Sequence, residues 1–259
     1  MLDYWQKQDK SKPLYEDLLW SRPEHKSQQG SLLIIGGNIH AITAPSRAYG
    51  IAIQQRIGHA RVIMPDKTIK IVGPHLPDIE FLPSTSVGSL GLSAFVSIKT
   101  SATQTNAILL AGDFAKNSET SVLLEQIARL PGLQIYTQDA LDAFTKTPAL
   151  LLDRPETLLV IDFARLQKFI SYSHFEHALT SDIGVVQMVE LLNIFSLKHQ
   201  SYILTRLDNV YLVVAKGQVV TTKLSSELTL PSVAAAAAVW WLQTPQKPLQ
   251  AIATALTCI

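Results

Sequence analysis

The sequence predicts an α/β fold in which a doubly wound, mostly parallel central sheet carries helices on both faces. Short apolar runs alternate along the chain with segments of helical spacing, which is the pattern of such sheets. The runs at 32–35 and 107–111 are apolar at successive positions rather than at every second one, as in strands covered on both sides. Several runs end at small or acidic residues that lead into the next helix.

The first strand is expected at 32–35, and Gly36, Gly37 and Asn38 follow it. Glycine tolerates positive φ, and its missing side chain lets a ligand approach the main chain closely. Thr43 is the expected N-cap of the next helix, whose N-terminus favours anions. The turn is therefore either one wall of a ligand site or a tight strand-to-helix connection without a ligand.

The remaining strands and helices follow the same alternation. Residues 83–106 are rich in Ser and Thr and are expected to form a loop or an insertion. Further strands are expected at 60–64, 69–72, 106–112, 133–136, 158–161, 202–205, 210–215 and 219–221, and further helices from Asn117 or Ser118 onward and at 140–144, 163–170, 184–195, 232–243 and 249–256.

Length and composition exclude several classes of protein. With 259 residues, 47% of them hydrophobic, the chain can bury one large core, so we expect a single domain over 1–259 with a helical or extended lead-in at 1–29. The net charge of +1 gives no electrostatic footprint for nucleic acid, and the single cysteine, Cys258, excludes an intramolecular disulfide. Residues 1–12 do not resemble a secretory signal, and the longest uncharged apolar block, 233–242, is about half of a membrane span. We therefore expect a cytoplasmic protein that binds neither nucleic acid nor membranes.

Acidic, histidine and tryptophan residues at a few positions are candidates for a site or an interface. Asp113 and Asp139 each follow a predicted strand, where open α/β sheets bind ligands, and each either contacts a ligand or caps the next turn. His174 and His177 either share a helix face and bind a metal or lie on a solvated face. The tryptophan pair at 240–241 indicates helix packing or an oligomer contact.

The order of motifs carries a resemblance to a known family. Residues 22–30 include His25-Lys26 and precede the first strand and Gly36-Gly37-Asn38; Gly58-His59-Ala60-Arg61-Val62 follows. This order resembles the ribokinase-like ADP- or ATP-dependent NAD(P)H-hydrate dehydratases, which have His-Lys-Gly-x-x-Gly, an apolar strand, Gly-Gly-Ser and later a Gly-Ala-Gly-Leu-Val strand. The match runs in order over nearly the whole chain and is close in the first third.

The resemblance implies a ribokinase-like fold and the nucleotide-dependent dehydration of hydrated NAD(P)H. It implies ADP or ATP, an NAD(P)H-type ligand and Mg²⁺ as cofactors or ligands. The family's binding residues correspond here to His25, Lys26, Gly36, Gly37, Asn38, Gly112, Asp113 and Asp139.

The later motifs depart from the family pattern. The family's Gly-Pro-Gly-Leu-Gly loop corresponds to 112–116 and keeps only its first glycine, and its Asp-Ala-Asp-Ala-Leu-Asn strand end corresponds to 137–142 and keeps Asp139. The segment with the family's substrate-side histidine has no histidine here. The late Gly-x-Gly-Asp turn corresponds to 229–234, which contains neither glycine nor acid, and Pro231 removes a backbone donor there. Ser232 is the expected cap of the following helix and faces the nucleotide phosphate in this interpretation.

Three functions stay open at this point. The first is a divergent NAD(P)H-hydrate dehydratase-like protein with weak or lost catalysis, because loss of a general base costs a factor of about 10²–10⁴; Asp139 is then the one catalytic candidate. The second is a non-catalytic domain that binds a nucleotide or dinucleotide or has a structural role. The third is a small-molecule kinase, which needs the same missing base. The sequence decides neither catalysis nor whether the chain forms a homo-oligomer.

Overall fold

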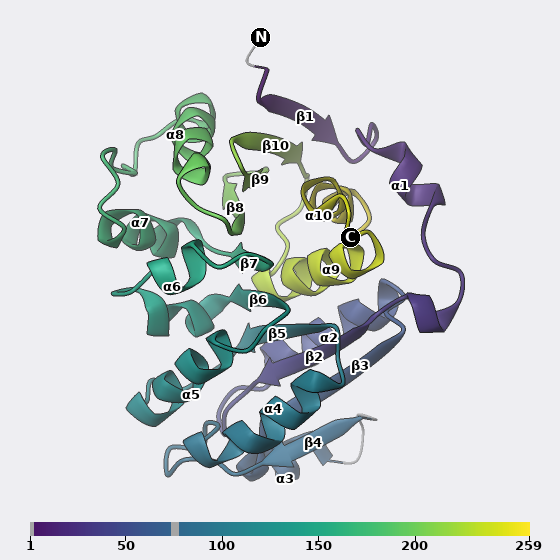
Figure 1. Ribbon diagram of the computed structural model, residues 1–259, viewed down its shortest axis with the longest axis vertical. Helices are drawn as coiled ribbons and strands as arrows, with labels where there is room; N and C mark the ends of the chain where they lie inside the picture. The colour runs from purple at the N-terminus through teal and green to yellow at the C-terminus, as the bar shows by residue number, and fades with distance from the viewer. Residues whose placement is uncertain (1–2, 74–77) are drawn as a thin grey trace.

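A single mixed sheet organises the molecule in the computed structural model, which describes residues 3–73 and 78–259 (Figure 1). Among these residues, ten strands follow the order β1-β10-β9-β8-β7-β6-β5-β2-β3-β4. β9 runs antiparallel to both of its neighbours, and every other neighbouring pair is parallel. The predicted mostly parallel sheet is confirmed.

The strands are short, as is usual for α/β proteins. Their bounds are β1 Trp5–Asp9, β2 Ser31–Gly36, β3 His59–Pro65, β4 Ile79–Leu82, β5 Ala107–Gly112, β6 Leu133–Thr137, β7 Thr157–Val160, β8 Tyr202–Leu207, β9 Val210–Ala215 and β10 Gln218–Lys223. The helices are α1 Glu16–Trp20, α2 Thr43–Gln54, α3 Ile69–Val72, α4 Phe95–Thr103, α5 Ser118–Ala128, α6 Ala149–Leu152, α7 Phe163–Tyr172, α8 Val185–Leu197, α9 Leu230–Gln243 and α10 Pro248–Thr257. Two 3₁₀ turns matter below, η1 Lys26–Gln28 and η5 Gln138–Phe144.

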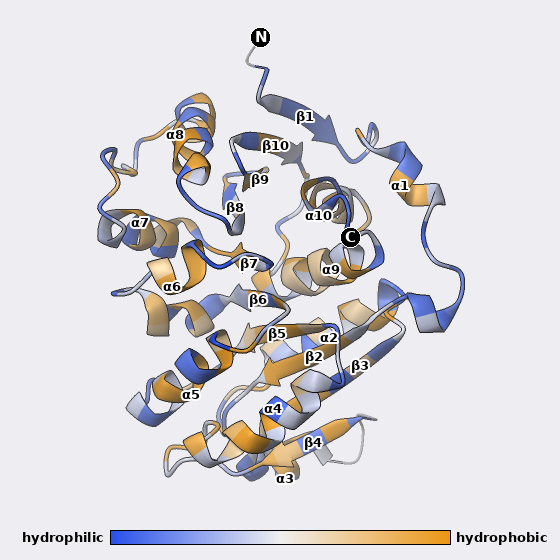
Figure 2. Ribbon diagram, in the orientation of Figure 1, coloured by the Kyte–Doolittle hydropathy of each residue, from blue (hydrophilic) through white to orange (hydrophobic). Residues whose placement is uncertain are grey.

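Both faces of the sheet are covered by helices, which explains the uninterrupted apolar runs. Leu33 and Ile35 of β2 point into the core under α4, α5, α6, α7 and α8, whereas Leu32 and Ile34 point into the core under α2, α9 and α10. All four side chains have 0% exposure. Figure 2 shows the central strands β2 and β5 largely orange and the edge strand β1 largely blue. The burial of alternate residues on opposite faces confirms the prediction for these strands.

α9 is buried on nearly all sides, because small alanines at 234–238 let it lie close to the sheet, α2 and α10. The Trp240 indole is 1% exposed and donates its N–H to Oε1 of Gln55 at 2.9 Å. Trp241 packs edge-on against Tyr202, with 4.5 Å between the ring centroids. The tryptophan pair therefore serves helix packing, and none of the helices in the described part of the chain is long and apolar enough to cross a membrane.

The edge strand β1 was not predicted, because its sequence Trp-Gln-Lys-Gln-Asp is polar. Side-chain hydrogen bonds hold it against β10: Trp5 donates to the Thr221 hydroxyl at 2.9 Å, and Gln8 donates to the Thr222 hydroxyl at 2.9 Å. Bonds of this kind leave no hydrophobic pattern in the sequence.

Two predictions of local structure are wrong. The alternating residues 69–72 form helix α3 instead of a strand, because Ile69 and Ile71 stay about half exposed and Val72 alone is buried. The segment 83–106 is not a continuous loop, since it contains α4, whose Ile98 packs under the sheet. The neighbouring strand β4 was also not predicted.

Candidate functional site

The direction of chain winding changes between β2 and β5. From β2 the sheet grows outward through β3 to β4, and from β5 it grows the other way through β6 and β7 to β8. Open α/β sheets bind ligands at the carboxyl ends of the strands beside such a switch point. Gly36-Gly37-Asn38 and Gly112-Asp113 lie there, each following a strand that the sequence predicted.

The glycines at this switch point allow β2, β5 and η5 to approach one another. The Gly37 amide donates to the Gly112 carbonyl at 3.0 Å, and a Cβ on Gly36 would lie 2.5 Å from that same carbonyl oxygen. Gly112 has φ +107, and a Cβ there would lie 2.2 Å from Oε1 of Gln138. The space that the missing side chains leave at these glycines is therefore filled by other parts of the protein and not by a ligand.

The first turn of α2 already has a carboxylate. Oδ2 of Asp113 accepts a hydrogen bond from the Ala44 amide at 2.7 Å, although Asp113 needs the left-handed φ of +60 to reach it. Asn38 holds this turn by donating from Nδ2 to the Asp113 carbonyl at 2.6 Å. The prediction of Thr43 as N-cap is wrong: Thr43 is the first helical residue, Ile42 precedes it without a side-chain bond, and Asp113 supplies the acceptor from another strand.

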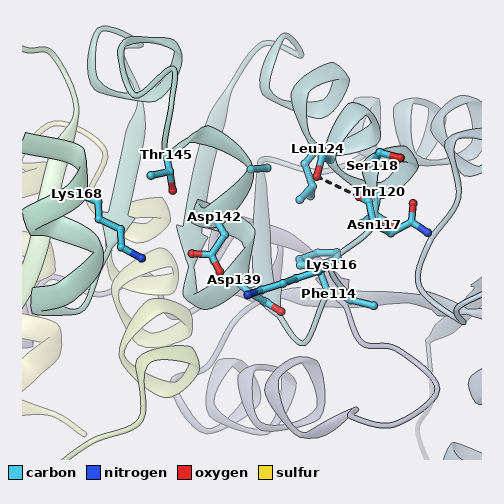
Figure 3. Close-up of a pocket in the computed structure, with 13 residues that line it drawn as sticks. Phe114, Lys116, Asn117, Ser118, Thr120, Leu124, Asp139, Asp142, Thr145 and Lys168 are labelled. Carbon is cyan, nitrogen blue, oxygen red and sulfur yellow. Dashed lines mark hydrogen bonds between the residues drawn. The ribbon is translucent and has the colours of Figure 1, made fainter. Parts of the chain in front are cut away.

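Next to this turn, the segment after β5 and the elements α5, η5 and α7 enclose a cleft of about 480 Å³ (Figure 3). This volume lies within the range of small-molecule sites, about 300–1,000 Å³. We call it the Asp139 cleft; its lining residues are Phe114, Ala115, Lys116, Asn117, Ser118, Thr120, Ser121, Leu124, Asp139, Asp142, Ala143, Thr145 and Lys168.

Asp139 is the chemically distinctive residue of the cleft. Its Oδ1 atom is buried and has no hydrogen-bond partner among the described residues. The pKa of Asp139 is raised to about 6, mainly by burial; the negative charges of Asp113 and Asp142 also raise it, whereas the hydrogen bond from the Phe114 amide and the charge of Arg165 lower it. A carboxyl group with this pKa exchanges a proton close to neutral pH, as an acid or base in catalysis must.

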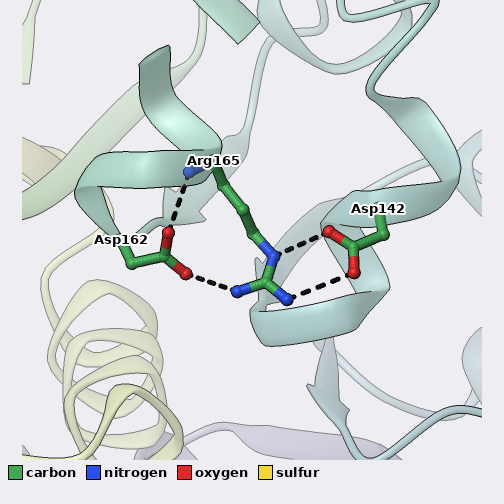
Figure 4. Close-up of polar contacts among 3 residues, drawn as sticks. All are labelled: Asp142, Asp162 and Arg165. Atoms are coloured by element: carbon green, nitrogen blue, oxygen red, sulfur yellow. Dashed lines mark hydrogen bonds and ion pairs between the residues drawn. The ribbon is translucent and has the colours of Figure 1, made fainter. Parts of the chain in front are cut away.

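Both carboxylate oxygens of Asp142 accept hydrogen bonds from Arg165 (Figure 4). Nε of Arg165 lies 2.7 Å from Oδ1 of Asp142, and Nη2 lies 3.1 Å from Oδ2. Nη1 pairs with Asp162, which also caps α7 by accepting the Arg165 amide at 2.8 Å. The hydrogen bonds to Asp142 raise the pKa of Arg165, with a smaller increase from Asp162. We call this pair of hydrogen bonds from Arg165 to Asp142 the fork. It connects η5 to α7 and occupies both oxygens of Asp142.

Two lysines give the Asp139 cleft positive charge. Lys116 comes from the segment after β5 and Lys168 from α7, whose side chain extends toward the cleft in Figure 3. In the part of the chain that the structure describes, neither forms an ion pair. The cleft also includes the N-terminus of α5, where Oδ1 of Asn117 accepts the Glu119 amide at 2.7 Å, as one of the predicted caps. These features favour an anionic ligand.

Sequence reasoning missed Lys116, Lys168 and Arg165 as site residues. Lys116 lies in 112–116, the segment that corresponds to the family's glycine loop, so its position in the sequence could have indicated a site residue. Lys168 lines the cleft from α7, the helix that follows β7, and Arg165 of the same helix binds Asp142 at the cleft; only the packing of α7 beside η5 brings them there.

The N-terminus of α9 differs from the prediction. The helix begins at Leu230, with Thr229 as N-cap, so Ser232 lies inside the first turn and not at the cap. A proline is favoured in the first turn of a helix, and Pro231 accordingly places the start earlier. Ser232 is buried, and its hydroxyl bonds to the Thr229 hydroxyl at 2.8 Å.

The histidines lie away from the Asp139 cleft. His25 and Lys26 are exposed residues at η1, before the amino end of β2, and the Gly36-Gly37-Asn38 turn follows its carboxyl end. His174 and His177 do not share a helix face, because α7 ends at Tyr172 and His174 adopts φ +57. Within 3–73 and 78–259, no three His, Cys, Asp or Glu side chains converge as a metal site would require.

Comparisons with known proteins place this geometry in a fold family. No protein-family model and no curated protein matches the chain. Among solved structures, a ribokinase-like superfamily protein from Enterococcus faecalis aligns over 99% of this chain and 87% of its own, with 17% identity and a TM-score of 0.74. The chain has the ribokinase-like fold.

Two other structural neighbours are named as enzymes. An ADP/ATP-dependent NAD(P)H-hydrate dehydratase from Bacillus subtilis, co-crystallized with ATP and Mg²⁺, aligns over 94% of this chain and 86% of its own at 13% identity and a TM-score of 0.61. A phosphomethylpyrimidine kinase from Clostridium difficile aligns over 88% of this chain and 100% of its own at 10% identity and a TM-score of 0.53. At these identities the likeness concerns the fold, and it confirms the fold class that the sequence predicted.

Proposed function

We propose that this ribokinase-like protein binds an anionic small molecule of the nucleotide or dinucleotide class in the Asp139 cleft, without turnover by the usual dehydratase mechanism. The observation that carries the proposal is the half-buried Asp139, whose buried Oδ1 atom has no partner among the described residues, in a cleft that two lysines make positive. An amide or hydroxyl of the ligand would satisfy Oδ1, and its phosphate would lie between the lysines and the N-terminus of α5. ADP, ATP and an NAD(P)H-type molecule are the ligands that the ribokinase-like neighbours suggest.

The residues of α9 do not fit the phosphate site of a nucleotide-dependent enzyme. Leu230 and Pro231 begin the helix, proline has no N–H, and Ser232 is buried against Thr229. No acid follows in this turn to accept a proton. The segment therefore lacks one backbone donor and the base that the mechanism requires.

The carboxylates of the Asp139 cleft also fit a Mg²⁺ ion poorly. A magnesium site uses carboxylates that are free to coordinate. Both oxygens of Asp142 are held by Arg165, and Asp139 is partly protonated near neutral pH because of its raised pKa. The proposed function therefore assigns no role to a metal ion.

A thermal-shift experiment tests the binding proposal. A ligand that binds only the folded chain stabilises it by about 2.7 kcal/mol at 100 times its Kd. AMP, ADP, ATP and NADH are added to the wild-type chain and to the double variant Lys116→Ala, Lys168→Ala. At least one nucleotide raises the Tm of the wild-type chain, and the increase is smaller in the double variant by the part that the Asp139 cleft contributes.

The matched control is Lys99→Ala, which removes an exposed lysine from α4 away from the cleft. This variant keeps the full ligand-dependent increase in Tm. If no nucleotide at millimolar concentration changes the Tm, or if the Lys99 variant loses the effect to the same extent as the double variant, the proposed site is wrong.

Dehydration of hydrated NADH is a second candidate, favoured by the pKa of Asp139 near 6. The protein is incubated with hydrated NADH and ADP or ATP, and the recovery of NADH absorbance is followed. Recovery that scales with wild-type protein and disappears in Asp139→Asn establishes this reaction; absence of recovery leaves the binding function. Consumption of ATP without NADH recovery indicates a kinase instead.

A further inference from the structure

A second cleft lies beside the amino ends of β2 and β3, whereas the Asp139 cleft lies at the carboxyl ends of the strands. It has a volume of about 570 Å³ and is enclosed by the lead-in segment after α1, the end of α2 and the end of α10. Figure 1 shows the lead-in passing along this side of the molecule. We call it the Arg22 cleft, because Arg22 and Arg56 line it together with Trp20 and Glu24. The function proposed above does not involve it.

Arg22 is held in a fixed position by three groups. Its Nε donates to Oε1 of Gln243 at 2.8 Å, its Nη2 donates to the Gln55 carbonyl, and its guanidinium lies 4.4 Å from the centre of the Trp240 ring. Nη1 has no hydrogen-bond partner among the described residues, so its two N–H groups are available to a ligand. A guanidinium fixed in advance loses little conformational entropy when it binds an anion.

The positive charge of the Arg22 cleft is not balanced. Arg22 forms no ion pair in the described chain, and burial lowers the pKa of its guanidinium. Arg56 is exposed, likewise forms no ion pair there, and adopts the left-handed φ of +60 at the end of α2. The backbone carbonyl of Arg56 accepts Nε2 of Gln243 at 2.9 Å, which fixes the start of its side chain. Glu24 is the one carboxylate among the lining residues, so two guanidiniums face one acid.

Trp20 gives the same cleft an aromatic wall. Its side chain is 88% exposed, which makes it the most exposed of the large hydrophobic residues that the structure describes. An indole ring in water is available to stack on a planar group, and such stacking contributes about 1–3 kcal/mol for a nucleobase. The cleft thus presents a planar apolar surface and two guanidiniums to the same volume.

We propose that the Arg22 cleft is a second ligand site, which binds a small anion carrying a planar ring, of the class of nucleoside monophosphates. The ring stacks on Trp20, and the anion pairs with Nη1 of Arg22 and with Arg56. The ligand is noncovalently held, and no chemical step is assigned to the site.

Tryptophan fluorescence reports on this site directly, with AMP as the probe. AMP quenches the fluorescence of the wild-type chain in a saturable way, and Trp20→Phe removes the quenching. Arg56→Gln weakens binding about tenfold, because one charge-assisted hydrogen bond is lost. Inorganic phosphate and adenosine each bind more weakly than AMP, because each makes only half of the contacts.

Two controls separate this site from the Asp139 cleft. Arg129→Gln removes another exposed arginine, at the end of α5, and leaves the quenching curve unchanged. The double variant Lys116→Ala, Lys168→Ala also leaves the curve unchanged, whether or not the Asp139 cleft binds nucleotides. The proposal is overturned if AMP at millimolar concentration causes no saturable quenching, if Trp20→Phe retains it, or if Arg56→Gln and Arg129→Gln behave alike.

Discussion

The raised pKa of Asp139 makes a prediction about stability that does not depend on any ligand. The ordinary value of 3.8 becomes about 6 in the folded chain, mainly through burial. Between these two pH values the folded state binds more protons than the unfolded state, so the free energy of unfolding falls as the pH rises from about 4 to about 6. Above that range the full cost of burying the charged carboxylate remains.

The size of this cost follows from the same pKa values. The difference between 3.8 and about 6 corresponds to about 3 kcal/mol, and partial access of solvent to the group reduces this to about 2 kcal/mol. Asp139→Asn cannot ionise, so at about pH 8 its free energy of unfolding exceeds that of the wild-type chain by about 2 kcal/mol. This gain corresponds to an increase in Tm of about 4–8 °C for a chain of this size. At about pH 4 the two proteins have nearly equal stability.

Urea unfolding of both proteins across this pH range measures the difference. Asp208→Asn is the matched control, because it makes the same substitution at an exposed residue in the turn between β8 and β9. A gain for Asp139→Asn that is the same at both ends of the pH range refutes the reasoning, and so does a loss that grows with pH. The first result means that folding does not change the proton affinity of Asp139, and the second means that the folded chain stabilises the ionised carboxylate.

Three further substitutions test the packing around the cleft by urea unfolding. Gly112→Ala destabilises the chain by more than about 2 kcal/mol, because φ is +107 and the new Cβ would lie 2.2 Å from Oε1 of Gln138; an effect below about 1 kcal/mol contradicts the close approach. Arg165→Met costs about 1–2 kcal/mol through the lost fork to Asp142, and the cost shrinks in high salt; a cost that salt does not change points to lost packing instead. Asn117→Ala costs about 1 kcal/mol through the lost N-cap, whereas Asn117→Asp retains most of the stability.

The sequence predicted the parts of the fold that depend on burial and on local chain direction. The run at 32–35 is apolar on both faces because helices cover both faces, and its position beside β5 follows from the winding of the chain. Asp139 was identified from its place at the end of a strand, and the structure adds the burial that alters its proton affinity.

Features that depend on distant contacts were not predictable from the sequence. β1 is polar and joins the sheet through hydrogen bonds between residues more than 200 positions apart. The cap of α2 comes from Asp113, 69 residues beyond Ala44, so the local pattern pointed to Thr43 instead. The position of Lys168 in a helix can be predicted from the local sequence. Its place in the cleft cannot, because it depends on residues that are distant in the sequence.

The contact between Asp113 and the first turn of α2 has a consequence for competition among anions. The carboxylate is attached to the chain, so it acts at an effective concentration that a free anion in solution does not reach. An external phosphate at this helix must displace an internal occupant before it gains any bond of its own. The N-terminus of α2 is therefore already occupied by the Asp113 carboxylate. The groups that are free to bind an anion lie at the Asp139 cleft.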